Sequence, residues 1–246
     1  MGRLCFEPSD TKTGAGTHVA LELHSLRSQA ARPLNSTRSD KNVSKRSSSA
    51  LAEVDANPQG KGQVGFLLDW AYSSPRGVVA KRAPQLLADY FTSLLVLSAA
   101  FKFKPVFGKD YFLYRESDTW SLSLVSPDEW NADAKWAAFV GKCILHADST
   151  WSIEPADNIG KQDIVDDALA MFYDGFIDKL RSQKPLEDNL PIYEAGLPYY
   201  QRLFAAALSR SVRGSLSLGD QLGRKSENWL ATLPKDASRL FLAHYS

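Results

Sequence analysis

The chain has little of what marks a secreted, membrane-spanning or nucleic-acid-binding protein. It holds two cysteines, Cys5 and Cys143, among 246 residues. Two cysteines cannot make a disulfide framework, which favours a reducing, cytoplasmic compartment. The net charge of +1 gives no overall attraction to nucleic acid or to an acidic membrane. The most apolar window, 86–101, is interrupted by Asp89 and is shorter than the about twenty residues that a membrane span needs. We therefore expect no membrane span and no nucleic-acid partner for the chain as a whole.

Sequence signatures of catalysis are also scarce. Residues 214–219 (Gly-Ser-Leu-Ser-Leu-Gly) do not have the spacing of a serine-hydrolase elbow, and no phosphate loop or dinucleotide fingerprint occurs. Cys143 and His146 are three residues apart on a predicted strand, which places their side chains on opposite faces. We therefore expect neither a cofactor nor a zinc or cysteine-based site there.

Acidic residues gather at one predicted helix start, at Asp163, Asp166 and Asp167. Aspartates three and four residues apart share a helix face, and Mg²⁺ binds such oxygens. A metal-dependent hydrolase or transferase is therefore an alternative reading of the chain. Acids in the first turn also stabilise a helix through its dipole, which explains the cluster without a metal. We favour this second explanation and predict no metal ligands.

Composition divides the chain into three parts. Residues 1–58 are rich in Ser, Thr, Asn, Arg and Lys, and such a segment buries too little apolar surface to offset its ordering entropy. We expect a disordered polar tail there. We assign residues 59–155 to a domain with a helix and a small sheet. Residues 156–246 form a helical C-terminal region that we expect to pack on that domain.

Hydrophobic periodicity predicts an α+β fold, in which a small antiparallel sheet packs on a long apolar helix and a helical region follows. The helix covers 78–101, and Pro84 either kinks it or lies in the first turn of its second half. Alternating residues predict the strands, and three- and four-residue steps predict the later helices. The predicted strands are 111–115, 120–125, 140–146 and 150–153. The predicted later helices are 163–180, 199–210, 227–232 and 235–244.

Aromatic side chains are concentrated in and around the predicted sheet. The set comprises Tyr111, Tyr114, Trp120, Trp130, Trp136 and Trp151. Rings on a small sheet can form a recognition surface that grips a peptide or stacks on bases. They can equally build the core of a sheet that has little area of its own. We favour the core, and keep the six residues as the candidate binding set.

The segment 104–155 carries three recognisable motifs. The first strand matches through Pro105, Gly108, Tyr111, Leu113 and Tyr114. The element after the second strand matches through Ser123, Ser126, Pro127, Glu129 and Trp130, with Asp128 where the pattern has Glu. The third motif matches through Phe139, Gly141, Asp148 and Trp151. In these motifs the segment, about a fifth of the chain, resembles the domain-of-unknown-function family 2452, a group of small intracellular proteins. No activity comes with this resemblance.

Taken together, these features favour a non-catalytic intracellular binding or scaffold protein with a protein partner. The metal-dependent enzyme with its acids near Asp163 is the first alternative. A nucleic-acid accessory protein that uses the basic residues of the tail is the second. The two alternatives depend on separate parts of the chain.

Deleting residues 1–55 should leave the thermal stability unchanged, because a segment of this composition contributes no core. The measurement compares melting curves of the full-length and shortened proteins. A melting temperature that falls by several degrees on deletion would show that the tail packs on the folded part.

Overall fold

The structure is a computed structural model in which part of the chain is described. It describes residues 62–129, 138–157, 159, 163–191 and 196–235. The tail predicted over 1–58 lies outside these residues, and so does the helix predicted over 235–244 apart from Lys235.

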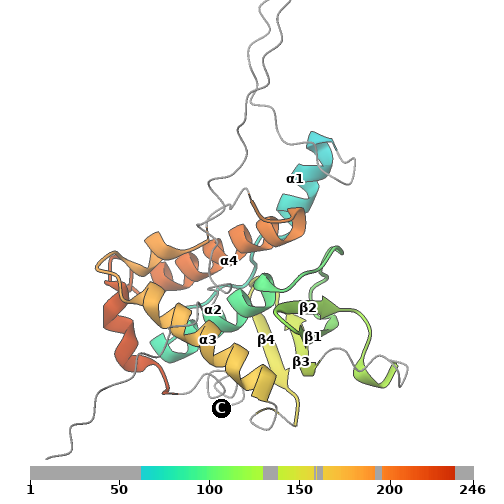
Figure 1. The fold of residues 1–246 in the computed structure, drawn as a ribbon. Helices are drawn as coiled ribbons and strands as arrows, with labels where there is room; N and C mark the ends of the chain where they lie inside the picture. The colour runs from blue at the N-terminus through green and yellow to red at the C-terminus, as the bar shows by residue number, and fades with distance from the viewer. Residues whose placement is uncertain (1–61, 130–137, 158, 160–162, 192–195, 236–246) are drawn as a thin grey trace, which may run out of the picture.

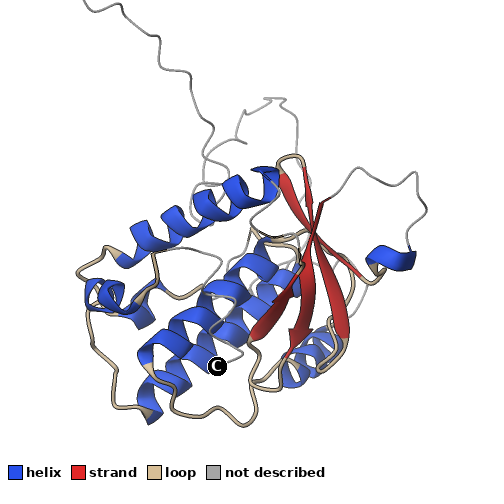
Figure 2. Cartoon of the chain, turned by 90° about the horizontal axis from the view of Figure 1, so that it is seen from below, coloured by secondary structure: helices blue, strands red, loops and turns tan. Residues whose placement is uncertain are grey.

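Helix α2 (Ala83–Ser98) lies at the centre of the fold, between the sheet and the other long helices (Figures 1 and 2). All twelve residues from Leu86 to Leu97 are buried, so the helix has no solvent-exposed face over three turns. Residues 78–82, predicted as helix, are not helical. Pro84 lies in the first turn and has no N–H to continue the helix upstream, so the helix begins at Ala83.

Four antiparallel strands form one sheet in the order β2-β1-β3-β4. Their bounds are β1 Asp110–Glu116, β2 Thr119–Ser123, β3 Ala138–Leu145 and β4 Trp151–Pro155. The predicted turn between the first two strands contains Ser117 at a φ of 39°. Strand β2 ends two residues earlier than predicted, where the Val125 N–H donates to the Ser123 hydroxyl at 3.0 Å, and the 3-10 helix Pro127–Glu129 follows. There the Ser126 N–H donates to the Glu129 carboxylate at 3.0 Å.

Two further long helices, α3 and α4, follow the sheet and confirm the α+β fold class. Helix α3 (Asp163–Leu180) has the predicted bounds, and its predicted face is buried. Helix α4 (Tyr199–Leu218) continues eight residues beyond the predicted end at 210. The prediction was short because Gly214 and the serines around it lower helix propensity. Val212 and Leu216 nevertheless continue the buried face, and this packing outweighs the propensity. Two 3-10 helices, Leu186–Asn189 and Ser226–Thr232, flank α4 in sequence.

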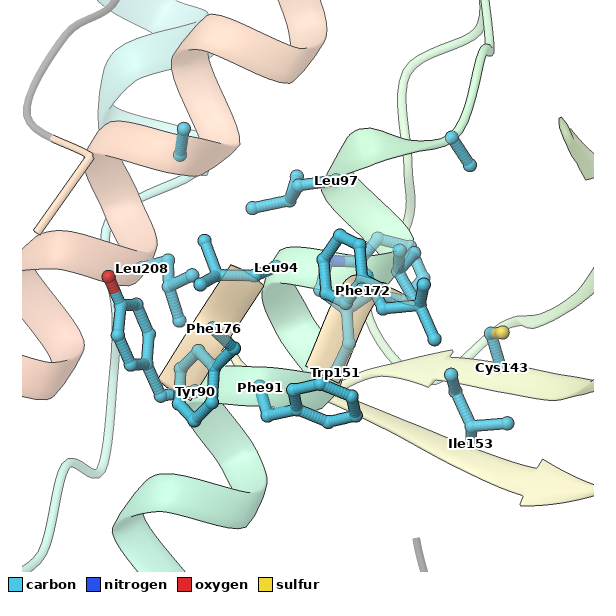
Figure 3. Packing of buried hydrophobic residues seen from close by; sticks show 14 of the residues in the cluster. Tyr90, Phe91, Leu94, Leu97, Cys143, Trp151, Ile153, Phe172, Phe176 and Leu208 are labelled. Carbon is cyan, nitrogen blue, oxygen red and sulfur yellow. The ribbon is translucent and has the colours of Figure 1, made fainter. Parts of the chain in front are cut away.

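One hydrophobic core joins the sheet and the helices on both sides of position 155 (Figure 3). Phe91 of α2 lies at its centre. Its ring meets Phe172 and Phe176 of α3 edge-on, with centroids 5.5 and 5.3 Å apart. Such edge-to-face pairs add to the stabilisation by burial. The fully buried Trp151 brings β4 into the same core.

Helix α1 (Gln63–Tyr72) is attached to this body through a buried acid. Asp69 accepts hydrogen bonds from Lys104 at 2.7 Å and from the Tyr199 hydroxyl at 3.0 Å. The opposite side of α1 leaves Leu67 and Leu68 exposed. Across the described part of the chain, no helix combines the length and the apolar character required to cross a membrane.

Replacing Gly141 by alanine should destabilise the sheet, because β4 passes close to its Cα. A Cβ at this position would lie 2.5 Å from the Glu154 carbonyl oxygen and 2.7 Å from the Ile153 side chain. We expect a loss of about 1–3 kcal/mol in the free energy of unfolding, measured by urea denaturation. Gly196, where a Cβ meets nothing within 4 Å, is the control. Equal stabilities of Gly141→Ala and Gly196→Ala would contradict the close β3–β4 contact.

Candidate functional site

A cleft of about 630 Å³ opens where the β1–β2 hairpin meets the helices. Four segments form its walls: the end of α2 with the residues that follow it, the hairpin turn, the middle of α3 and the start of α4. Its lining residues are Ser98, Ala100, Phe101, Lys102, Arg115, Asp118, Thr119, Trp120, Ala168, Met171, Pro198 and Gln201. The cleft therefore depends on both sides of the predicted boundary at 155.

The hairpin register places Arg115 and Trp120 together on one wall. They are directly opposite each other on β1 and β2. The Arg115 guanidinium lies over the Trp120 ring, 4.8 Å from its centroid. An antiparallel pair brings such side chains to the same face of the sheet, and a cation over an indole is attracted by the ring quadrupole. This contact holds the guanidinium beside the Trp120 ring at the cleft wall.

The hydrogen-bonding capacity of Arg115 is only partly used at this position. Its Nε is buried and has no hydrogen-bond partner, and none of the described acids forms an ion pair with it. Burial lowers the pKa of the guanidinium, although attraction to the nearby Asp118 opposes the shift. Arginine remains charged across the physiological range, so Arg115 presents a positive charge to the cleft.

The other walls are largely apolar. Phe101 and Ala168 are buried there, whereas Met171 of α3 is 56% exposed. Gln201 is held in place because its side-chain amide donates to the Ala99 carbonyl oxygen. The cleft thus has the Arg115–Trp120 pair on one wall and a methionine on the facing helix. Methionine is unbranched and adapts its shape to a partner.

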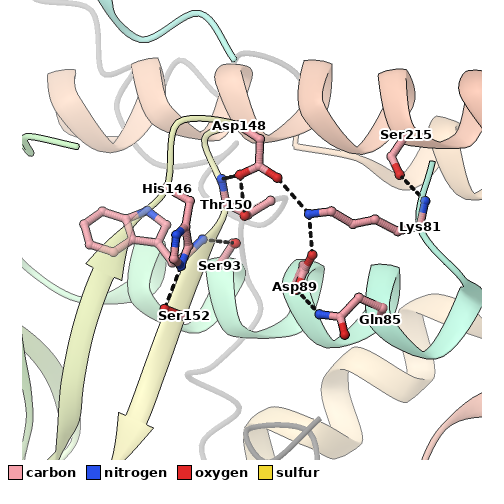
Figure 4. Close-up of polar contacts among 10 residues, drawn as sticks. Lys81, Gln85, Asp89, Ser93, His146, Asp148, Thr150, Ser152 and Ser215 are labelled. Carbon is pink, nitrogen blue, oxygen red and sulfur yellow. Dashed lines mark hydrogen bonds and ion pairs between the residues drawn. The ribbon is translucent and has the colours of Figure 1, made fainter. Parts of the chain in front are cut away.

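A second polar cluster lies at the start of α2 (Figure 4). Lys81 contacts the Asp89 carboxylate at 2.5 Å and the Asp148 carboxylate at 2.7 Å. Gln85 donates to the other oxygen of Asp89 at 2.8 Å, and the Thr150 N–H and hydroxyl donate to the other oxygen of Asp148. Every carboxylate oxygen in the cluster therefore has a partner.

These contacts favour the ionised forms of Lys81 and Asp148. Burial would raise the pKa of the Asp148 carboxyl, but hydrogen bonds from Lys81 and Thr150 outweigh it and lower that pKa. Burial would lower the pKa of Lys81, but attraction to Asp89 and hydrogen bonds to both acids raise it. The cluster joins α2, the segment before it and the β3–β4 turn. We interpret it as a structural clamp.

The four described members of the candidate aromatic set differ in where they lie. Tyr111, Tyr114 and Trp151 are at most 4% exposed, so these three lie in the interior rather than on an open recognition surface. Trp120 is 7% exposed and lines the cleft. Trp130 and Trp136 lie outside the described residues.

The other predicted candidates do not converge on the cleft. Cys143 is buried on β3 and burial raises the pKa of its thiol, whereas His146 is exposed and contacts the Ser152 hydroxyl at 2.7 Å. Asp166 is partly buried and Asp167 exposed in the first turn of α3. Within the described ranges, no three His, Cys, Asp or Glu side chains are grouped so that they could hold a metal ion.

Sequence reasoning missed the cleft and the clamp for different reasons. Arg115, Lys102 and Met171 come from three segments, and no local pattern connects them. Asp89 did carry a signal, since it is the single acid in an otherwise apolar helix segment. A charge on a helix without an exposed face must find a partner, but the sequence does not show that the partner is Lys81.

Replacing Lys81 by methionine should cost about 3–5 kcal/mol in the free energy of unfolding, because two neighbouring carboxylates then lose their cation. The exposed Arg181, which pairs with Asp178, is the control. Arg181→Met should cost about 1 kcal/mol or less. Urea denaturation at pH 7 measures both variants. Similar small losses would show that the clamp contributes no net stability.

The clamp should also make stability depend on acid pH. The folded protein lowers the pKa of Asp148, so its stabilisation is complete above the unfolded-state value of about 4 and is lost as the pH falls through the folded-state pKa. Denaturation midpoints between about pH 5 and pH 2 should therefore fall less steeply for Asp148→Asn than for the wild type. Parallel pH profiles of the two proteins would contradict a lowered pKa at Asp148.

Comparison with known proteins adds a family to this description but no activity. No curated protein and no solved structure matches the chain. Residues 78–174, about two fifths of the chain, match the model of the family DUF2452, described as a protein of unknown function. The match begins just before the clamp and runs through the sheet into α3. It confirms the resemblance carried by the motifs of the sheet, since the segment 104–155 lies within the matched range.

Proposed function

We propose that this is a non-catalytic binding protein that receives a segment of a protein partner in the cleft beside Trp120. The observation that carries the proposal is the meeting of Arg115, Trp120 and Met171 around one concavity. Arginine, tryptophan and methionine are enriched in protein–protein interfaces, and arginine and tryptophan dominate their binding energy. The buried Cys143 thiol is compatible with a reducing, cytoplasmic location.

The shape of the cleft favours a protein segment over a compact small molecule. Small-molecule sites enclose most of the surface of their ligand. Here Lys102, Asp118, Thr119 and Met171 are exposed although they line the cleft, so a compact ligand would keep much of its surface in water. A peptide can fill the cleft with one or two side chains while the rest of it continues across the rim.

The chemistry of the lining supports binding rather than catalysis. Of the described residues that line the cleft, none is a histidine or a cysteine, the side chains most readily used as a base or nucleophile near neutral pH. The Ser98 hydroxyl donates to the Leu95 carbonyl oxygen at 2.7 Å and is thus engaged by the backbone. The ionisable side chains that line the cleft are Arg115, Lys102 and Asp118.

A larger side chain at the mouth of the cleft should weaken peptide binding. Peptides enriched from a displayed random library on the wild-type protein serve as probes, and isothermal titration measures their affinity. Met171→Trp places a large ring at the mouth of the cleft and should weaken binding at least tenfold. Ile164→Trp is the matched control, because Ile164 is similarly exposed on α3 but does not line the cleft. Enriched peptides that bind Met171→Trp as tightly as the wild type would place the binding site elsewhere.

A further inference from the structure

We infer that the partner segment is acidic: it places an Asp or Glu carboxylate on Arg115 and a neighbouring apolar side chain against Trp120 and Met171. This inference rests on the proposed function and adds the chemistry of the partner. It follows from the unmet bonding capacity of Arg115, from the charges at the rim of the cleft and from the apolar wall beside them.

Arg115 is chemically suited to receive a carboxylate. Its guanidinium is held over the Trp120 ring, and it forms no ion pair with any acid in the described part of the chain. A guanidinium offers donors in a rigid fork that matches a carboxylate, and charge-assisted bonds of this kind are the strong ones. Because the contact with the Trp120 ring already restrains the side chain, Arg115 loses less freedom when a carboxylate binds.

The charged side chains at the rim of the cleft favour a ligand group with a single negative charge. Arg115 and Lys102 supply two cations, and Asp118 supplies one anion close to Arg115. The surplus of one positive charge complements a carboxylate. Phosphopeptide sites use clusters of arginines to meet a charge of about −2 and three acceptor oxygens. With a single arginine and an acid beside it, this cleft fits a carboxylate better than a phosphate.

The apolar wall lies within reach of the same segment. Trp120 and Phe101 each line the cleft with 7% of their surface exposed, and Met171 projects from α3 with more than half of its surface exposed. Methionine adapts its shape to different partners and contacts aromatic and aliphatic groups equally well. An apolar side chain next to the acidic residue would cover Met171 and exclude water from the new ion pair, which strengthens it.

The test uses the full-length protein and a displayed library of random seven-residue peptides, with Met171→Trp as the counter-selection protein. We expect the enriched peptides to contain an acidic residue beside an aromatic or aliphatic one. Replacing that acidic residue by its amide should weaken binding at least tenfold, and so should Arg115→Gln. Arg181→Gln, at an exposed arginine outside the cleft, should change nothing. Asp118→Asn removes the competing acid from an exposed position and should tighten binding.

The possible results separate this inference from the proposed function. If the amide peptides bind as tightly as the acidic ones and Met171→Trp still blocks them, the cleft binds peptides but the acidic preference is wrong. Enrichment of basic or uncharged sequences would overturn the inference in the same way. If no peptide is enriched over the Met171→Trp background, both the inference and the proposed function fail. Should Arg115→Gln not fold, the opposite effect of Asp118→Asn still decides the role of charge.

Discussion

The structure depends on one constraint: helix α2 is largely apolar and is buried around its whole circumference over 86–97, so it must be covered on every side. The sheet covers one side, and α3 and α4 cover others, so elements far apart in sequence share a single core. The one acid in this stretch, Asp89, is buried with them and is compensated by Lys81. Because removal of one partner of a buried ion pair is expensive, the clamp determines how the segment before α2 and the β3–β4 turn close over the helix.

The residues that mark the family have structural roles in this chain. Gly141 allows β4 to approach β3, and the Tyr111 hydroxyl accepts a hydrogen bond from the Val106 N–H at 2.7 Å. Asp148 belongs to the clamp, and the backbone N–H of Trp151 donates to the Ser93 hydroxyl in the core at 2.8 Å. These roles explain why the motifs identify the fold yet suggest no activity. The cleft forms beyond the end of α2, between the hairpin, α3 and the start of α4, and we propose this part of the chain as the binding site.

Local patterns predicted much of this fold, because alternation and helical periodicity report which side of an element is buried. The bounds of α3 and the presence of four antiparallel strands followed from them. They failed where packing overrides local preference, as in α4, which continues through Gly214. They also placed the start of α2 too early, because Pro84 lies in its first turn and residues 78–82 are not helical. The candidate site was predicted only through Trp120. Its other essential residues, Arg115 and Met171, meet because the hairpin and α3 pack on the same helix, and no short-range pattern contains that information.

The central claim is that the cleft between the hairpin and α3 is the binding surface. Amide chemical-shift mapping tests it most directly, by titrating ¹⁵N-labelled protein with the most strongly enriched peptide. The account predicts that the largest changes fall on residues 98–102 and 118–120 and around Met171, with little change on α1. Changes that are largest on the exposed side of α1, around Leu67 and Leu68, or on the outer sheet face at Phe112, would contradict it.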